Sequence, residues 1–418
     1  MLARIENALA GVVDAETRRN MRIEALAALA LGPYQAAMGF VPVVMRRLGA
    51  TPELIAAYMA ASYVGFFLAP FSARVMPVRG AHRTLAWYLA ASRAVFALAG
   101  QAVTAPAMLL AGLVYTFLDT FPSPAYTRVM QLIYPARARA RIMAFVRMGM
   151  AAAMLVITPL AGRLLDEAGP GWLFGLSGGL GVLSALLFTR LRVPDGGAAG
   201  LPHRPLRELW PVLRDDRRYR VFLLTVTAFG LGGLIAIAFY PTVIVDRLHL
   251  SYAEVGLLST AQVVAWLIGY LVWGQLMDRK SGIWSLRALY LMMGIIPLCY
   301  LLAGDGWMLL PAFVIQGLGS AGIDLAFLAA TIELARDDRT YEYAALQRSV
   351  IGLRGLFGPF IGVWLAGMGI PAHVIFILAA SMYVAAAVLM MSRVFRPGAA
   401  AAPAAAPSSV PSPALSKE

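Results

Sequence analysis

An acidic residue, Asp119, lies deep inside a long apolar segment, where an ionised carboxylate is unfavourable by about 2.5–3.5 kcal/mol. A carboxyl group in such surroundings is a candidate for binding and releasing a proton near neutral pH. The alternative is a structural aspartate that is protonated or paired with an arginine. The residue belongs to a series at helical spacing that would form one polar stripe on an apolar helix, namely Gly112, Tyr115, Thr116, Asp119, Ser123 and Tyr126.

A second acidic residue and two arginines occupy similar positions in other apolar segments. Asp324 shares a helical face with several small residues, which admit either a ligand or a neighbouring helix. Arg93 and Arg354 also lie far from the ends of their segments. Because an unpaired arginine near the centre of a membrane is unfavourable, we expect each to approach a carboxylate, a backbone carbonyl or a water-filled cavity. Asp119 is the candidate partner of Arg93 and Asp324 that of Arg354, so both arginines are interpreted as buried counter-ions.

Side-chain amides, hydroxyls and aromatic rings in these segments suit the binding of a small solute. Gln262 shares a helical face with Trp266, whose ring could stack on an aromatic or cationic compound. The sequence therefore predicts a cavity that is lined by Gln35, Tyr115, Thr116, Ser123, Tyr126, Gln262, Trp266 and Gln316.

The chemistry typical of soluble enzymes is largely missing from the sequence. The four histidines are far apart and lie outside the apolar segments or at their ends, and neither an H-E-x-x-H nor a G-x-x-x-x-G-K-[ST] motif occurs. A single cysteine, Cys299, excludes an intramolecular disulfide. We therefore expect a protein that is not an enzyme, with no cofactor and no metal site.

Membrane-spanning helices must hold these residues in place. The chain is 60% hydrophobic and 14% charged, whereas soluble domains carry about 25% charged residues. Its apolar blocks have the length of roughly 20 residues that crosses about 30 Å of hydrocarbon. The blocks predict twelve spans: 23–45, 54–73, 84–103, 107–130, 142–165, 172–191, 221–245, 251–277, 285–302, 307–334, 343–366 and 372–394.

The basic residues predict the orientation of the spans. With the N-terminus inside, 26 Lys and Arg fall on the inner side and four on the outer side. Positive charge marks the cytoplasmic side of a membrane protein, so both termini should be cytoplasmic and the protein should lie in the cell membrane. The net charge of +13 is then explained by one face of a membrane, and nucleic acid is not expected as a partner.

An internal repeat divides the chain into two parallel halves. A shift of 200 residues superposes Pro159 on Pro359 and Gly162 on Gly362. The fold class is therefore an all-α polytopic membrane protein, with twelve transmembrane helices in two six-helix parallel repeats around a central cavity. The predicted divisions are an N-terminal amphipathic segment (1–22), a six-helix bundle (23–191), a cytoplasmic linker (192–220), a second six-helix bundle (221–394) and a disordered tail (395–418).

Two local motifs add a family resemblance over about residues 22–396. Residues 274–279 read Gly-Gln-Leu-Met-Asp-Arg, similar to the G-x-L-x-D-R loop motif of the major facilitator superfamily of secondary transporters. Residues 358–362 read Gly-Pro-Phe-Ile-Gly, similar to its antiporter motif. The loop after the second span lacks the acid of the loop motif. The resemblance implies that the first, fourth, seventh and tenth spans line the central cavity.

The resemblance also implies a cytoplasmic gate made of loops. In this family, the loop after the eighth span packs on the start of the fifth, and the loop after the second packs on the start of the eleventh. The charges at these two contacts are opposite in this chain, which would hold the loops together in an outward-open state. The expected gate residues are Asp278, Arg279, Arg79, Arg139, Arg141 and Glu342.

Together these features predict a secondary active transporter of a small solute that works by alternating access. Protons are the expected coupling ion, carried by Asp119 and Asp324. Acids and aromatic rings in the cavity favour efflux of an amphipathic or cationic compound. The alternatives are proton-coupled uptake of an organic anion or other small metabolite, with Arg93 or Arg354 as counter-ion, and a non-transporting membrane sensor on a transporter fold. The expected partners are the solute, protons and the lipid bilayer, and the expected state is a monomer.

Overall fold

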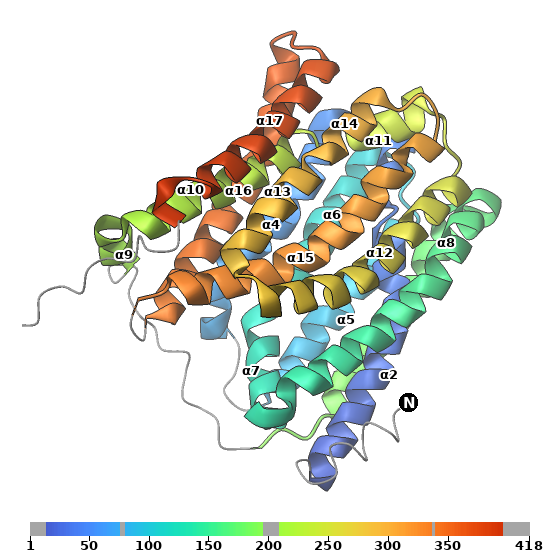
Figure 1. Cartoon of the computed structure of the whole chain (residues 1–418). Helices are drawn as coiled ribbons and strands as arrows, with labels where there is room; N and C mark the ends of the chain where they lie inside the picture. The colour runs from blue at the N-terminus through green and yellow to red at the C-terminus, as the bar shows by residue number, and fades with distance from the viewer. Residues whose placement is uncertain (1–13, 76–79, 195–208, 337–338, 396–418) are drawn as a thin grey trace, which may run out of the picture.

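The computed structural model describes residues 14–75, 80–194, 209–336 and 339–395 of the chain. Its first half comprises α2 (Ala15–Met38), α3 (Val41–Arg47), α4 (Pro52–Val75), α5 (Ala81–Ala99), α6 (Ala105–Thr120), α7 (Ser123–Ile133), α8 (Ala136–Leu187) and η1 (Phe188–Arg190). Its second half comprises α9 (Leu209–Asp215), α10 (Arg217–Ile235), α11 (Tyr240–Thr242), η3 (Val243–Arg247), α12 (Tyr252–Arg279), α13 (Gly282–Met293), α14 (Ile295–Leu302), η4 (Trp307–Leu309), α15 (Leu310–Leu334), α16 (Thr340–Gly367), α17 (Ala372–Met390) and η5 (Arg393–Phe395). Figure 1 shows these helices packed side by side as long rods.

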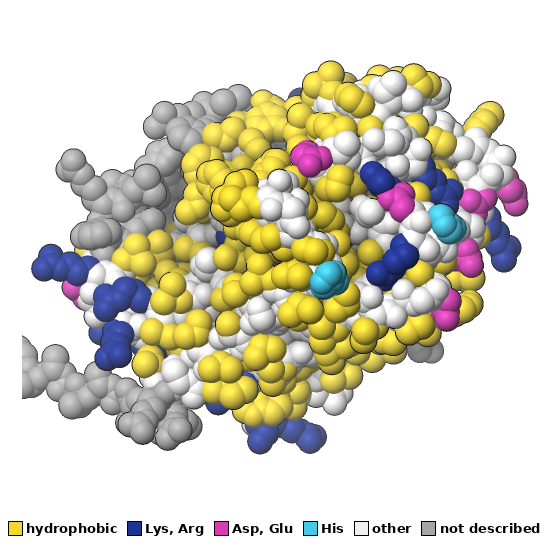
Figure 2. All heavy atoms as spheres, turned by 90° about the horizontal axis from the view of Figure 1, so that it is seen from above, with side chains coloured by type: hydrophobic (Ala, Val, Ile, Leu, Met, Phe, Trp, Pro, Cys, Tyr) yellow, Lys and Arg dark blue, Asp and Glu magenta, His cyan; other side chains and the backbone are white. Residues whose placement is uncertain are grey.

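The helices account for all twelve predicted spans. Nine helical segments of the described residues are long and apolar enough to cross a membrane, and one of them, Arg137–Arg190, contains two crossings. These two crossings are the arms of α8, which meet at the non-helical Gly169 (φ +77°) beside Pro170. α4 and α5 supply the remaining two. Figure 2 shows charged side chains gathered at opposite ends of the molecule with a broad apolar surface between them, as a bilayer requires.

The backbone carries the same repeat as the sequence. Left-handed residues recur at an offset of 200, at Gly49 (φ +83°) and His249 (φ +51°), and again at Gly169 and Gly369 (φ +84°). Each position ends one transmembrane segment before the next begins. Since positive φ is rare outside such turns, the two halves use the same loop geometry at equivalent positions. The prediction of two parallel six-helix repeats is confirmed.

The N-terminal segment differs from its prediction. Residues 15–22 are the first two turns of α2 and continue directly into the first span, so they do not form a separate surface helix. Asp14 caps this helix, because its carboxylate accepts a hydrogen bond of 2.8 Å from the Thr17 amide. Residues 1–13, most of the linker and the tail from residue 396 lie outside the described residues.

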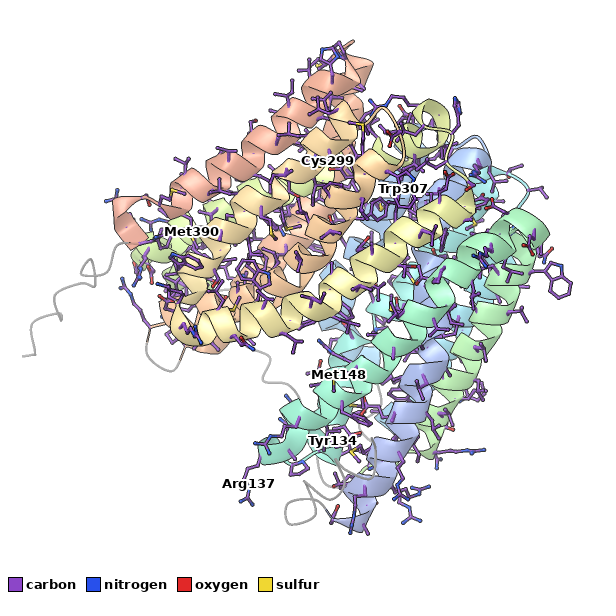
Figure 3. The ribbon with its side chains drawn as sticks, turned by 45° about the vertical axis from the view of Figure 1, so that its right-hand side comes forward. Tyr134, Arg137, Met148, Cys299, Trp307 and Met390 are labelled. Atoms are coloured by element: carbon purple, nitrogen blue, oxygen red, sulfur yellow. The ribbon has the colours of Figure 1, made fainter. Side chains whose placement is uncertain are left out.

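Polar contacts join the two halves at one end of the bundle, here called the closed end. The Arg46 guanidinium forms an ion pair with Asp246, and its Nε lies 2.8 Å from Oδ2 of that carboxylate. Asp166 accepts hydrogen bonds from the backbone amides of Tyr252 (3.0 Å) and Ala253 (2.7 Å). Figure 3 shows the helices of the two halves running together near Trp307, whereas Arg137 and Met390 mark tips that lie apart. The opposite end, where α2 begins, is here called the terminal end.

Candidate functional site

A central cavity of about 530 Å³ lies between the two halves. Four helices of the first half reach it, namely α2, α3, α4 and α8, and the remaining walls come from the second half. Its polar and aromatic lining consists of Gln35, Tyr63, Thr158, Phe229, Tyr240, Ser259, Gln262, Tyr300, Phe313, Gln316, Arg354 and Tyr383. A space of this size suits a small organic solute.

Arg354 is the charged residue of this lining. It projects from α16 into the cavity, and its Nε and Nη1 are buried and donate no hydrogen bond to any described residue. Its guanidinium carbon lies 5.9 Å from the centre of the Phe229 ring. Electrostatic interactions with tyrosines, among them Tyr63 and Tyr383, are its described polar surroundings. The residue is half-buried, and its two buried donors without an acceptor are an unfavourable arrangement unless a ligand completes it.

A glycine on the neighbouring helix makes room for this arginine. A Cβ atom on Gly230 of α10 would overlap the Arg354 guanidinium. Gly233, one turn further along α10, faces the Tyr383 hydroxyl in the same way, at 2.9 Å from the position of a Cβ. The small residues of α10 therefore fix where the arginine and its tyrosine neighbours sit.

Three of the predicted solute-binding residues reach the cavity together. Gln35 comes from α2, Gln262 from α12 and Gln316 from α15, so segments of both halves contribute an amide. The Gln316 amide group donates a hydrogen bond of 3.4 Å to the Ser320 hydroxyl, which in turn donates to the Gln316 carbonyl at 2.7 Å. Amides offer both donors and acceptors, so they can bind hydroxyl, carbonyl or ring-nitrogen groups of a solute.

Aromatic side chains of the second half complete the cavity, and they were not predicted from the sequence. Tyr240 and Tyr300 stack with ring centroids 4.1 Å apart. Phe229 packs edge-on against Tyr383 at 5.3 Å. One available signal was the run of glycines in α10, because small residues mark a close approach of neighbouring groups.

Asp119 and Arg93 lie inside the first half and are not part of the described cavity lining. Arg93 of α5 is 4% exposed, donates a hydrogen bond of 3.2 Å to the Gly181 carbonyl and lies over the Tyr34 ring at 5.6 Å. It also interacts electrostatically with the Asp119 carboxylate, and the pairing of these two residues remains a prediction. Arg93 therefore has a carbonyl partner and an electrostatic interaction with a carboxylate, although its Nε, like two donors of Arg354, is buried without an acceptor among the described residues.

The polar stripe of the fourth span packs within the first half, so the expected fourth-span wall is not found in the described lining of this cavity. The Tyr115 hydroxyl hydrogen-bonds to the Tyr58 hydroxyl at 2.7 Å, and the Thr116 hydroxyl donates to the Gly112 carbonyl at 2.6 Å. Ser123 begins α7, after Pro122 has ended α6. Tyrosine and threonine hydroxyls thus satisfy one another and the backbone in the buried part of the stripe, whereas Asp119, Ser123 and Tyr126 are half-buried.

Tyr126, the last member of the stripe, leads to a residue that the sequence analysis missed. Its hydroxyl donates to Glu24 Oε1 at 3.1 Å, and the Tyr134 hydroxyl donates to the other carboxylate oxygen. Glu24 lies in α2 and is 2% exposed. A carboxylate within the first predicted span was the available signal, because acids are rare in such segments.

The pairing of Asp324 with Arg354 is wrong. Asp324 of α15 is exposed and accepts a hydrogen bond of 2.9 Å from the Tyr270 hydroxyl of α12, and Trp266 packs edge-on against Tyr270 at 5.2 Å. Arg354 instead faces α10 and α17. The positions of the two charged residues along their spans predict similar depths in the membrane, but they do not determine which way each helix is rotated. Trp266 is likewise not among the described residues that line the cavity.

The predicted gate residues are only partly described. Arg139 donates to the carbonyls of Gln131 (3.0 Å) and Tyr134 (3.1 Å) within its own half. Arg141 and Arg279 are exposed, and Glu342 is buried beside Arg339. Arg79 and the side chain of Asp278 lie outside the described residues, so the loop contacts remain predictions.

Comparisons with known proteins agree on one fold. A family model described as Major Facilitator Superfamily matches residues 25–240 and 221–416. None of the curated protein sequences compared with the chain matched it. The crystal structure of the nucleoside transporter NupG is 13% identical, with a TM-score of 0.64, and covers 90% of this chain and 98% of its own. A point mutant of NupG is 12% identical at a TM-score of 0.69, with 91% and 100% covered.

A bacterial homologue of the human lysosomal transporter Spinster has the same arrangement of helices. Its inward-facing, occupied structure is 13% identical, with a TM-score of 0.61, and covers 89% of this chain and 96% of its own. At such low identity these likenesses show a shared fold, and the site has to be interpreted from its own residues.

Proposed function

The chain belongs to the Major Facilitator Superfamily, and on this basis we propose that it is a secondary transporter that carries a small organic anion by alternating access. The observation that carries the proposal is Arg354, a cation with two unused donors in the central cavity. Planar guanidinium groups bind carboxylate and phosphate groups through paired hydrogen bonds. An anionic solute would supply the acceptors that the described residues do not.

The charge of the lining separates this proposal from efflux of a cationic compound. Neither Asp119 nor Asp324 is among the described residues that line the cavity, and no other acidic residue is. A cation would therefore meet Arg354 without a compensating carboxylate, and like charges in a low-dielectric site repel strongly. The lining favours the organic anion over the cation.

The rest of the solute should carry a flat or aromatic part. Stacked tyrosines and phenylalanines form one part of the lining, and the three glutamines offer hydrogen bonds around it. Aromatic side chains bind flat apolar surfaces and add about 0.5–1.5 kcal/mol per ring pair beyond area burial. An aromatic carboxylate is the simplest compound with both features.

The contacts at the closed end support alternating access. The ion pair of Arg46 with Asp246 and the hydrogen bonds of Asp166 hold the halves together on one side of the cavity. With the termini in the cytoplasm, as the basic residues predict, this conformation would be closed to the outside. Breaking these contacts would allow the halves to rock around the cavity.

Protons are proposed as the coupling ion, with Asp119 as their carrier. Asp119 shares the interior of the first half with Arg93, so loading or releasing a proton would change the net charge of that interior. Such a change alters the interactions of the helices that pack around it. Each proton that moves together with the anion would cancel one of its negative charges during the crossing.

A neutral nucleoside is the second candidate solute. The three glutamine amides and the stacked tyrosines also suit a nucleobase and its sugar hydroxyls, and NupG, which shares the fold, is a nucleoside transporter. This candidate leaves the donors of Arg354 without an anionic partner, so we rank it second.

Transport into liposomes tests the proposal. Purified protein would be reconstituted with a pH gradient and given labelled aromatic carboxylates, uridine, or an aromatic amine, with Arg354→Gln as the matched variant. We expect carboxylate transport that is driven by the gradient and lost in Arg354→Gln. Transport of uridine that survives Arg354→Gln would favour the second candidate, and transport of the amine would contradict both.

A further inference from the structure

A second cavity, of about 480 Å³, lies at the terminal end of the first half, far from the central one. It is formed by the start of α2 and by Arg190 of η1. Four of its seven lining residues are arginines, and the full lining is Ala15, Arg18, Arg19, Arg22, Ile23, Leu26 and Arg190. Four positive side chains around one space indicate a site for an anion.

Buried hydrogen bonds hold the two walls of this cavity together. Asn20, which is 2% exposed, donates to the Arg192 carbonyl at 2.8 Å and accepts from the Arg192 amide at 3.0 Å. Two turns deeper along the helices, the Ser184 hydroxyl donates to the Ala27 carbonyl at 2.7 Å. These contacts fix the end of the sixth span beside α2, so the approach of Arg190 to the arginines of α2 is built into the fold.

The described acidic residues near this cavity are not part of its lining. Asp14 is occupied as the cap of α2 and interacts with Arg18. Glu16 is exposed, and Glu24 faces Tyr126 and Tyr134 inside the bundle. None of these three acids is among the described lining residues, so the charged side chains of the lining are all arginines.

The arginines continue into an apolar surface along the same face of α2. Arg19, Arg22, Leu26 and Leu29 follow helical spacing, so two charges are succeeded by two leucines. Leu26 is 58% and Leu29 46% exposed, and Leu183 on the adjacent arm of α8 is 51% exposed. Exposed leucines on a membrane-spanning helix contact lipid chains, whereas the arginines stand at the level of the headgroups.

We propose that this cavity binds the headgroup of an anionic phospholipid, with an acyl chain along Leu26 and Leu29. The phosphate would accept charge-assisted hydrogen bonds from the arginines, and the chain would cover the exposed leucines. The arrangement of a basic pocket directly above an apolar surface fits an amphiphile better than a soluble anion. The proposal concerns a surface outside the transport cavity and does not depend on the identity of the solute.

Lipid binding to the full-length protein in a neutral detergent tests the proposal. The probes are dioleoyl phosphatidylglycerol, dioleoyl phosphatidylcholine, short-chain dihexanoyl phosphatidylglycerol and inorganic phosphate. We expect the dioleoyl anionic lipid to bind best, because it alone engages both the arginines and the leucines. Equal binding of phosphatidylcholine, or equal stabilisation by inorganic phosphate, would overturn the assignment to an anionic lipid.

Matched arginine variants locate the binding. Each arginine near a membrane surface contributes about fivefold in affinity for anionic lipid, so Arg18→Gln, Arg19→Gln and Arg190→Gln together should weaken binding roughly a hundredfold. The control combines Arg137→Gln, Arg214→Gln and Arg217→Gln, which removes the same charge from exposed positions outside the cavity. An equal loss in the control would show that binding depends on overall charge and would overturn the site. If the triple variant does not fold, Arg19→Gln alone should still lose about fivefold, and an unchanged affinity would likewise refute the site.

Discussion

Arg46 and Asp246 form an ion pair between the two halves, and they stand one repeat, 200 residues, apart. Equivalent positions of the two repeats therefore face each other at the closed end, one as a cation and the other as an anion. The pair is one of several contacts there, because Arg47 also donates to the Leu250 carbonyl and its guanidinium lies 3.6 Å from the centre of the Tyr252 ring. The closed end is therefore held in part by two opposite charges that occupy equivalent positions in the two repeats.

Asp246→Asn should weaken the closed end. Because the pair is partly exposed, we expect a modest shift of about 0.2–1 kcal/mol towards the state that is open there. The measurement is labelling of a cysteine placed at Ser259 in the central cavity, in a Cys299→Ser background, with an impermeant maleimide from the closed-end side. Labelling should rise up to about fivefold, and the exchanged pair Arg46→Asp with Asp246→Arg should restore it. Unchanged labelling in Asp246→Asn would show that the pair does not hold this end closed.

The two deep arginines should differ in their contribution to stability. Arg93→Gln removes a hydrogen bond to Gly181 and a charge beside Asp119, so it should lower the free energy of unfolding by about 1.5–3 kcal/mol. Arg354→Gln removes a charge with unused donors and should leave the stability of the ligand-free protein equal or higher. Thermal unfolding in detergent compares the two variants. A larger loss for Arg354→Gln than for Arg93→Gln would assign Arg354 a structural role.

Gly230→Ala should disturb anion binding without removing any charge. Its methyl group would overlap the Arg354 guanidinium and force this flexible side chain to move. Gly352→Ala is the control, because a Cβ at that position of α16 meets no atom within 4 Å. We expect weaker binding of aromatic carboxylates in Gly230→Ala and normal binding in Gly352→Ala. Normal binding in both variants would show that anion binding does not depend on the observed position of the Arg354 guanidinium.

Asp119→Asn should uncouple transport from the proton gradient. The amide keeps the shape of the side chain but cannot carry a proton, so gradient-driven transport should be lost while solute exchange remains measurable. Flux in liposomes with and without a pH gradient separates the two activities. Full gradient-driven transport by Asp119→Asn would assign the proton to another group, and Glu24, which is buried between two tyrosine hydroxyls, is the next carboxylate to test.

The fold could be predicted because its signals are local. Apolar length identifies each span, and the repeat is visible in residues such as Pro159 and Pro359 without any knowledge of contacts. Even the turn within α8 is marked by Gly169 beside Pro170. These features depend on hydrogen bonding and burial along the chain, which the sequence encodes directly.

The site was predicted less completely because it depends on how each helix is rotated. Polar spacing identified a stripe through Tyr115 and Thr116, but tyrosines and threonines also satisfy one another between packed helices, and the stripe faces inward. Gln35, Gln262 and Gln316 do meet in the cavity. The predicted pairing of Arg354 with Asp324 was wrong because charged residues at equal depth on two helices need not face each other.

The most direct test of an anion site at Arg354 is the binding of matched compounds to the purified protein. A library would contain aromatic carboxylates together with their neutral amide and cationic amine counterparts, and stabilisation would be measured by thermal unfolding of the wild type, Arg354→Lys and Arg354→Gln. We predict that carboxylates stabilise the wild type more than their amides and amines do, that Arg354→Lys retains part of this stabilisation, and that Arg354→Gln loses it. Stabilisation by amines or amides that equals that by carboxylates, or carboxylate binding that persists in Arg354→Gln, would contradict an anion transporter built around Arg354.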